Sequence, residues 1–171
     1  MRALVVYESM FGNTEAVARA VAEGLGTGLE VTVADVRTGP NITATEILVV
    51  GAPTHAFSLS RPGTRADAAT KGTVRPGATA TGVRELLDDA PRLDGIAAAT
   101  FGTKVDMTGL PGSAARKAHR MLRGHGARMI AAAENFHVAG MTGPLTDGEL
   151  DHARRWGAEL AASARRTRVT G

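Results

Sequence analysis

The chain has no cysteine, and this absence excludes disulfides, thiolate metal sites and cysteine nucleophiles. Aromatic residues are also few, with one Trp, one Tyr and four Phe. A surface that stacks on nucleic-acid bases needs more rings than these, and we therefore expect no nucleic-acid partner. No apolar run approaches the roughly 20 residues that span a bilayer, so we expect no membrane insertion.

A targeting signal is missing from the N-terminal segment. The chain passes from Met1 directly into a strand-like apolar run at residues 3–7, without the small-residue cleavage site of a signal peptide. Together with the lack of cysteine, this predicts a cytoplasmic protein. The length of 171 residues suits one domain. We place this domain at residues 1–166, followed by a basic tail at residues 167–171 that we expect to be mobile.

Lysine is scarce, and only 3 of the 20 basic residues are lysines. The formal net charge is +3, and the excess is uneven. Residues 1–110 hold 10 basic and 12 acidic residues, whereas residues 111–171 hold 10 and 5. We interpret the basic part as solvated helix faces and a solvated tail. The alternative is that the arginines at residues 165–168 dock an acidic redox partner.

Short apolar runs alternate with helical patterns along the chain. The runs predict strands at residues 3–7, 29–36, 47–50, 96–101 and 129–136, and apolar residues at helical spacing predict helices at 13–25, 83–89, 112–125 and 147–166. Apolar strands that alternate with helices indicate a parallel sheet covered on both faces. We therefore predict an α/β fold, a three-layer, doubly wound, five-stranded parallel sheet with strand order 2-1-3-4-5.

Three segments depart from this simple alternation. Residues 58–81 are rich in Gly, Pro, Thr and Ala, and we predict a long loop beside the functional site, with a short helix at 64–70 or disorder as alternatives. Residues 37–45 are polar and are expected to hold only a short turn or helix. The pattern Thr146-Asp147-Gly148-Glu149 predicts a capping box at the start of the last helix.

The candidate site follows from the predicted topology. In an open parallel sheet, ligands bind beyond the carboxyl ends of the strands, near the point where the strand order reverses. The loops at that point follow the first, third and fourth strands. They read SMFGNT at residues 9–14, GAPTHAF at 51–57 and TFGTKVD at 100–106.

The first of these loops is suited to an anion, because it leads into a helix whose N-terminal N–H groups are free. The hydroxyls of Ser9 and Thr14 and the amide of Asn13 can donate hydrogen bonds to phosphate oxygens. The loop has no lysine, and the patterns G-x-x-x-x-G-K-[ST] and G-x-G-x-x-G are missing. Neutral donors suit a terminal monophosphate better than a nucleoside triphosphate or a dinucleotide. Asn and Thr are, however, also ordinary helix caps.

The other two loops contribute rings. Residues 53–57 form a Pro-containing turn with His55 and Phe57, and Phe101 is followed by Gly102, which permits a close approach of the backbone. Such loops on both sides of a phosphate loop describe a slot for a flat ring with a phosphate tail. For Phe101 the alternative is packing in the core, and for His55 it is a solvated loop position.

Taken in this order, the three loops resemble those of the flavodoxin-like FMN-binding family. SMFGNT is similar to the family's phosphate loop, [ST]-x-[TF]-G-N-T. GAPTH at residues 51–55 resembles the G-x-P-T-[YH] turn beside the isoalloxazine, and FGT at 101–103 resembles the loop at the pyrimidine side of the flavin. The resemblance covers residues 1–166.

This resemblance implies FMN as the cofactor and electron transfer through it, with no catalytic amino acid required. It implies that the phosphate is held by Ser9, Met10, Phe11, Gly12, Asn13 and Thr14. The ring would lie between Pro53, Thr54, His55, Ala56 and Phe57 on one side and Phe101, Gly102, Thr103 and Lys104 on the other. The partners would be a redox protein or a small electron donor or acceptor, and a Lys104 cation beside the flavin would raise its reduction potential.

The chain also departs from electron-shuttling flavodoxins, which are usually acidic, and it carries His55 and Phe57 where Trp or Tyr is common. Two alternatives therefore stay open: an NAD(P)H:quinone-type flavin reductase, and a flavodoxin-like domain without FMN that acts in binding or regulation.

Other classes of protein with related architecture are excluded. Receiver domains need aspartates where this chain has Glu8 and Gly51, tyrosine phosphatases need a cysteine, and neither a G-x-S-x-G elbow nor clustered metal ligands occur.

Overall fold

The computed structural model describes residues 1–107, 109 and 111–169. Its elements, in chain order, are β1 (Arg2–Tyr7), α1 (Asn13–Leu25), β2 (Glu30–Asp35), the 3-10 turn η1 (Val36–Thr38), β3 (Ile47–Pro53), α2 (Pro62–Ala69), α3 (Val83–Asp88), β4 (Ala97–Val105), α4 (Ala114–Gly124), β5 (Arg128–Met129), β6 (Glu134–Val138) and α5 (Glu149–Val169). None of the helices within these residues is long and apolar enough to cross a bilayer.

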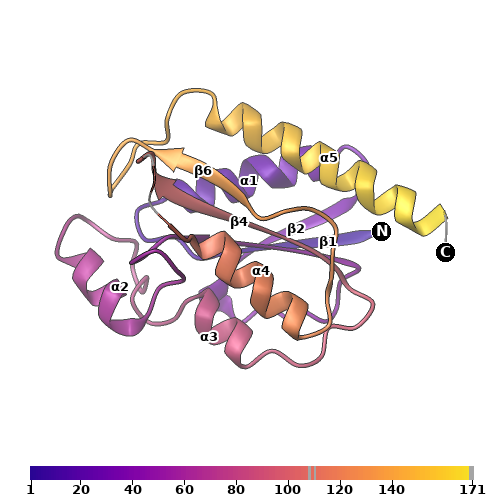
Figure 1. The fold of residues 1–171 in the computed structure, drawn as a ribbon, viewed down its shortest axis with the longest axis horizontal. Helices are drawn as coiled ribbons and strands as arrows, with labels where there is room; N and C mark the ends of the chain where they lie inside the picture. The colour runs from indigo at the N-terminus through magenta and orange to yellow at the C-terminus, as the bar shows by residue number, and fades with distance from the viewer. Residues whose placement is uncertain (108, 110, 170–171) are drawn as a thin grey trace.

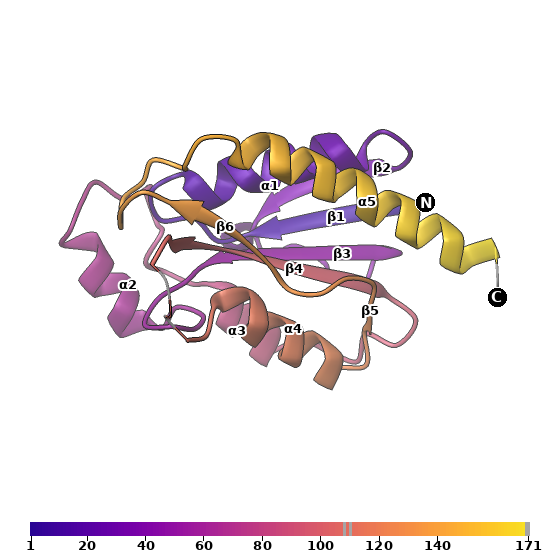
Figure 2. The ribbon, with the colours of Figure 1, turned by 45° about the horizontal axis from the view of Figure 1, so that its top comes forward.

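A parallel sheet forms the middle layer of the molecule. Its strands follow the order β2-β1-β3-β4-β5, and β6 pairs with β4 as well. Helices α1 and α5 cover one face of the sheet, and α3 and α4 cover the other (Figures 1 and 2). The predicted three-layer fold and strand order are therefore confirmed. The carboxyl ends of the strands point toward the end of the molecule where α2 lies (Figure 2).

The predicted fifth strand is two short strands. Met129 of β5 pairs with Ala98, whereas Glu134 of β6 pairs with Phe101. The pairing with β4 thus shifts by two residues between β5 and β6, and residues 130–133 lie between the two ladders. Because β6 pairs with the far half of β4, β4 extends to Val105, beyond its predicted end at residue 101.

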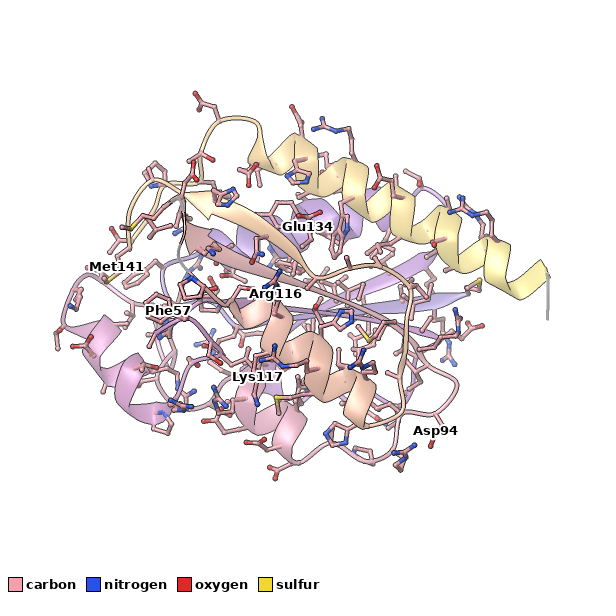
Figure 3. The ribbon with its side chains drawn as sticks, in the orientation of Figure 1. Phe57, Asp94, Arg116, Lys117, Glu134 and Met141 are labelled. Carbon is pink, nitrogen blue, oxygen red and sulfur yellow. The ribbon has the colours of Figure 1, made fainter. Side chains whose placement is uncertain are left out.

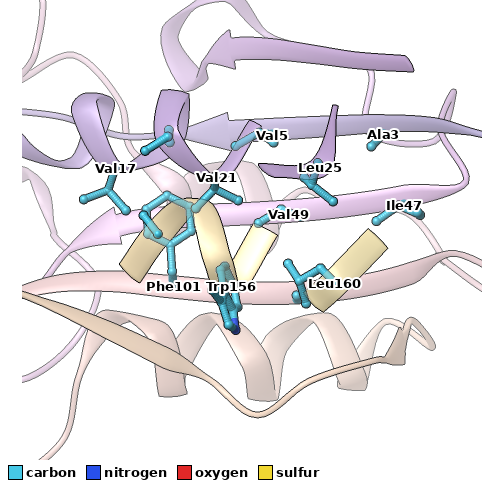
Figure 4. Close-up of a cluster of buried hydrophobic side chains, with 14 of the residues drawn as sticks. Ala3, Val5, Val17, Val21, Leu25, Ile47, Val49, Phe101, Trp156 and Leu160 are labelled. Atoms are coloured by element: carbon cyan, nitrogen blue, oxygen red, sulfur yellow. The ribbon is translucent and has the colours of Figure 1, made fainter. Parts of the chain in front are cut away.

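Two apolar cores lie on the two faces of the sheet. The core toward α1 and α5 includes Val49 and Trp156 (Figure 4). The core toward α3 and α4 includes Val50 and Leu122. Successive strand residues point to opposite faces, so the neighbours Val49 and Val50 enter different cores. This is why the strands appear in the sequence as unbroken apolar runs.

Helices α1 and α5 cross at two glycines. A Cβ on Gly24 would lie 2.0 Å from the carbonyl oxygen of Arg154, and a Cβ on Gly157 would lie 2.2 Å from that of Val21. Any side chain at either position would push the two helices apart. The close contact fixes α1, and therefore the loop that precedes it, against the rest of the domain.

Residues 58–81 are predicted as a long loop, but they contain the helix α2 at Pro62–Ala69, close to the alternative of a short helix at 64–70. The segment is anchored by Arg65, whose side chain is 1% exposed. The Arg65 guanidinium donates to the Glu85 carboxylate, and to the Ser60 hydroxyl at 2.9 Å. The Ser60 hydroxyl in turn donates to the carboxylate of Glu8 at 2.6 Å. This buried polar network holds α2 against the end of β1 and the start of α3, together with a small apolar cluster in which Ala68 packs on Met10 and Ala78.

The last helix begins differently from the prediction. The Thr146 hydroxyl donates to the carbonyl oxygen of His137 at 3.3 Å, and the Glu149 carboxylate accepts from the His137 N–H at 2.6 Å. Both side chains therefore bond to β6, and the predicted capping box is wrong.

Helix α5 continues to Val169, so the first three residues of the predicted tail are helical, while residues 170 and 171 lie outside the described residues. Near residues 37–45, η1 is the short helix that was expected.

Candidate functional site

The loops that follow β1, β3 and β4 converge on one pocket at the carboxyl ends of the strands. Its cavity volume is about 240 Å³. Eleven of the predicted site residues line it: Ser9, Met10, Phe11, Asn13, Thr14, Pro53, Thr54, His55, Ala56, Thr103 and Lys104. Four others, Gly12, Phe57, Phe101 and Gly102, do not belong to its lining.

Six further residues complete the pocket wall, and the sequence does not predict them. Thr64, Asp67 and Ala68 come from α2, and Val105, Val138 and Met141 come from the end of β4 and from β6 with its following loop. The α2 residues reach the pocket because Arg65 and Glu85 fix that helix. Val138 and Met141 reach it because the shifted pairing carries β6 to the end of β4.

The loop before α1 presents free N–H groups to this pocket. Gly12 caps the helix with a φ of 98°, a left-handed conformation that favours glycine. The first bond of the helix runs from the Ala16 N–H to the Gly12 carbonyl at 3.1 Å. The N–H groups of residues 13–15 therefore have no hydrogen-bond acceptor within the described part of the chain. Such a helix start binds anions.

The side chains of this loop are themselves held in place. The Ser9 hydroxyl accepts from the Gly12 N–H at 3.0 Å, and the hydroxyls of Thr14 and Thr103 lie 2.7 Å apart. The Asn13 amide donates to the Thr142 carbonyl at 3.1 Å. The Asn13 amide thus uses one of its two N–H donors to fix the loop that follows β6, and the other N–H is left for a ligand.

A cation reaches the same loop from the segment after α2. The Arg75 N–H donates to the Met10 carbonyl at 2.8 Å, and a Cβ on Gly12 would lie 2.7 Å from Nη2 of Arg75. The guanidinium also pairs with the Glu15 carboxylate at 3.0 Å. The loop has no lysine in sequence, yet the fold supplies an arginine beside it. Nothing within SMFGNT predicts this contact, because Arg75 lies more than 60 residues away in the chain.

The second loop is a tight turn fixed at both ends. The Thr54 N–H donates to the Thr103 carbonyl at 2.8 Å, and the Thr54 hydroxyl accepts from the Ala114 N–H at 3.1 Å. His55 and Ser58 exchange two backbone hydrogen bonds of 2.8 and 3.0 Å. Between them, Ala56 and Phe57 have φ values of 46° and 66°, which cost energy for residues other than glycine. The turn leaves Phe57 52% exposed and outside the pocket lining.

Phe101 packs in the core and does not flank the pocket. Its side chain is fully buried, and its ring meets those of Phe136 and Trp156 edge to face, at centroid distances of 5.9 and 6.2 Å. Gly102 faces α4, where an added Cβ would lie 3.1 Å from the Ala115 nitrogen. Of the third loop, only Thr103 and Lys104 from the prediction reach the pocket.

Three titratable side chains line the pocket, namely His55, Asp67 and Lys104. Burial lowers the pKa of His55 below its usual range, so this imidazole is neutral at neutral pH. Asp67 has Lys71 as a partner at 3.8 Å. The half-buried Lys104 ammonium donates to the Gly112 carbonyl at 3.5 Å and is a cation beside the pocket. The described residues contain no group of three or more His, Cys, Asp or Glu that could hold a metal ion.

These features define a flavodoxin-like α/β protein: a doubly wound sheet, a helix start with free N–H groups, and a pocket where the strand order reverses. The chain belongs to the flavodoxin family, because the model of the family described as flavodoxin matches residues 5–159. No curated protein matches the chain in sequence.

Several solved structures are similar in fold. A flavodoxin from the domain Archaea is 21% identical, with 96% of this chain and 99% of that chain covered and a TM-score of 0.66. A Streptococcus pneumoniae flavodoxin is 20% identical, with 95% and 99% covered and a TM-score of 0.68. A WrbA-like flavodoxin from Agrobacterium tumefaciens is 22% identical, with 96% and 98% covered and a TM-score of 0.62.

Membership of this family gives the protein FMN as its cofactor and makes it an FMN-binding electron-transfer protein. The residues present fit that cofactor. The free N–H groups at the start of α1 suit a phosphate, and neutral hydroxyls together with apolar side chains suit a flat, largely uncharged ring. FMN supplies the one- and two-electron chemistry, while the protein positions it and sets its potential.

Proposed function

We propose that this protein is a single-domain electron carrier whose FMN lies in the pocket described above. The observation that supports this most directly is that the loops after β1, β3 and β4 line one pocket, with the free N–H groups of α1 on one side of it. Reaction at a separate substrate site is not part of the proposal.

The phosphate is assigned to the loop at residues 9–14. The N–H groups of residues 13–15 and the hydroxyls of Ser9 and Thr14 are its donors, because they converge at the positive end of the helix dipole. Arg75 adds a positive charge beside the same loop. Together these groups favour a dianionic monophosphate.

The ring is assigned to the space between Pro53–Ala56 and Thr103–Lys104. Thr64, Asp67 and Ala68 of α2 close one side of this space, and Met141 lies on another. The neutral His55 contributes a flat ring without adding charge, whereas Lys104 contributes the cation. Lys104 therefore favours electron uptake, since it attracts negative charge that develops in the pocket.

Two observations favour a carrier over an NAD(P)H:quinone-type reductase. The cavity volume of about 240 Å³ is smaller than the roughly 300–1,000 Å³ of typical small-molecule sites, which leaves no space to enclose a second substrate beside a flavin ring. The match with the archaeal flavodoxin also covers 96% of this chain and 99% of that chain, so the two proteins are of comparable length.

The test is the visible spectrum of the purified protein, followed by removal and re-addition of flavin. We expect flavin absorption bands and tighter binding of FMN than of riboflavin, because only FMN carries the phosphate. A colourless protein that takes up neither flavin would instead support a domain that acts in binding or regulation. Steady oxidation of NADH or NADPH with a quinone acceptor would support the reductase.

A further inference from the structure

Helix α4 carries four basic residues and no acidic residue over Ala114–Gly124. Arg116, Arg120 and Arg123 recur at spacings of four and three, so they share one face of the helix. All three are exposed, while Ala118 and Leu122 on the opposite face are buried in the core. Within the described residues, none of the three arginines forms an ion pair.

Basic residues on two of the other surface helices have acidic partners. On α1, Arg19 pairs with Glu15 at 2.9 Å. On α5, Arg154 pairs with Asp151 at 2.9 Å and also with Glu23 of α1. Glu85 of the neighbouring α3 is engaged by Arg65. The charges of α4 are therefore left without partners, and like charges at helical spacing repel one another. Because these unpaired arginines destabilise the folded domain, we expect them to serve in binding another molecule.

This basic face starts at the edge of the pocket. The Ala114 N–H donates to the hydroxyl of Thr54, a pocket residue, and the Lys104 ammonium donates to the carbonyl of Gly112. Figure 3 shows Arg116 and Lys117 on α4, with Phe57 beyond the start of that helix. An incoming partner held by α4 would thus lie next to the pocket.

Exposed apolar side chains stand at the same place. Phe57 and Met141 are 52% and 58% exposed, and Figure 3 shows them at the same end of the molecule. Phe57 lies against the segment before α4, since a Cβ on Gly112 would be 3.3 Å from the Phe57 Cβ. Its φ of 66° is strained, and the turn nevertheless presents the ring to solvent. Aromatic and Met side chains are enriched in protein interfaces.

We propose that Arg116, Arg120, Arg123, Phe57 and Met141 form a docking surface, here named the α4 surface, for an electron-transfer protein with an acidic face. The inference rests on the proposed function as an electron carrier and adds the partner's charge and its place of binding. Unpaired arginines attract an acidic partner over about 10 Å and speed its encounter. The apolar side chains then exclude water beside the pocket. A nucleic acid would use the arginines but has no need of Phe57 and Met141.

The test uses the FMN-loaded protein and a reduced plant-type [2Fe–2S] ferredoxin, chosen as a probe for its acidic surface. Each reduced cluster gives one electron to the protein, so the cluster is oxidised as the bound flavin is reduced. Stopped-flow absorbance gives the second-order rate constant. The variant R116E/R120E is compared with R155E/R165E, which makes the same change of charge on exposed residues of α5, on the opposite face of the sheet.

We expect R116E/R120E to lower the rate constant about tenfold at low ionic strength, and the difference from wild type to shrink at high salt. R155E/R165E should stay close to wild type, and Phe57→Ala should lower the rate at all salt concentrations. Equal rates for the two double variants would overturn the proposal. So would α4-dependent binding of a 30-nucleotide single-stranded DNA with unchanged ferredoxin rates. Protein that lacks FMN, or that when reduced fails to reduce neutral benzoquinone, would instead refute the proposed carrier function.

Discussion

The hydroxyl oxygens of Thr14 and Thr103 lie 2.7 Å apart and are both buried. Thr14 is in the first turn of α1, and Thr103 is near the end of β4, so this contact joins the phosphate loop to the third loop. A hydroxyl has one proton to donate. If Thr103 donates to Thr14, the proton of Thr14 is free for a phosphate oxygen.

Replacing Thr103 by valine should therefore weaken FMN binding. The variant keeps the shape of the side chain but removes the donor that orients Thr14. The loss of one hydrogen bond of about 1 kcal/mol corresponds to a roughly fivefold higher Kd for FMN. Thr103→Ser keeps the hydroxyl and should bind FMN nearly as wild type does. Flavin fluorescence titration measures both. Equal affinities for the valine and serine variants would show that the contact does not support binding.

Arg75 should contribute to the binding of FMN through its phosphate. Because its guanidinium lies beside Gly12, Arg75→Ala removes a positive charge near the anion, and we expect about a tenfold loss of FMN affinity at low salt. The affinity for riboflavin, which has no phosphate, should change little. Arg92→Ala is the control, since Arg92 is exposed and its partners, Asp94 and the Gly124 carbonyl, do not line the pocket. Equal losses for FMN and riboflavin would place Arg75 in loop folding instead of phosphate binding.

Lys104 should set the reduction potential of the bound flavin. A cation near the pocket stabilises the extra negative charge of the reduced state, by on the order of 1 kcal/mol at a partly exposed site. Lys104→Ala should lower the midpoint potential by tens of millivolts, whereas Lys104→Arg should retain it. Spectroelectrochemical titration measures the midpoint. An unchanged or higher potential in the alanine variant would contradict this role.

The sequence predicted the fold well because its main signals are local. Apolar strands and amphipathic helices encode the layers, and SMFGNT encodes both a phosphate loop and the start of α1. The predictions that the structure corrects involve contacts between segments that are distant in the chain. Phe101 has the same ring whether it lines a pocket or packs on Trp156, and only the alternation along β4 turns it toward the core.

The α2 residues of the pocket wall, which the sequence does not predict, have a similar explanation. Residues 58–81 contain few large apolar residues, so the sequence offered no reason to expect a fixed helix there. The structure anchors it with polar contacts of Arg65, whose partners Ser60, Thr79 and Glu85 lie up to 20 residues away. A charged residue in a Gly- and Pro-rich segment reads as solvated until its carboxylate partner is located in space.

Glu8 should make the stability of the domain depend on pH in a direction set by its burial. Burial raises the pKa of Glu8 above its usual range, although Ser60 and the Val83 N–H donate to its carboxylate. The unfolded chain releases this proton near the ordinary pKa of about 4.3, whereas the folded chain keeps it to higher pH. Between these two pKa values the unfolded state binds fewer protons, so the Glu8 contribution to the free energy of unfolding falls as pH rises.

Chemical denaturation of the wild type and of Glu8→Gln, from pH 4 to pH 8, isolates this contribution, since all other groups titrate in both proteins. We expect the stability of the wild type relative to Glu8→Gln to be highest at low pH and to decline as the pH rises. Glu159→Gln, an exposed change on α5, should give a difference that is nearly flat with pH. A relative stability that instead rises with pH would mean that the donors of Ser60 and Val83, with Arg65 nearby, outweigh burial and hold Glu8 ionised in the folded protein.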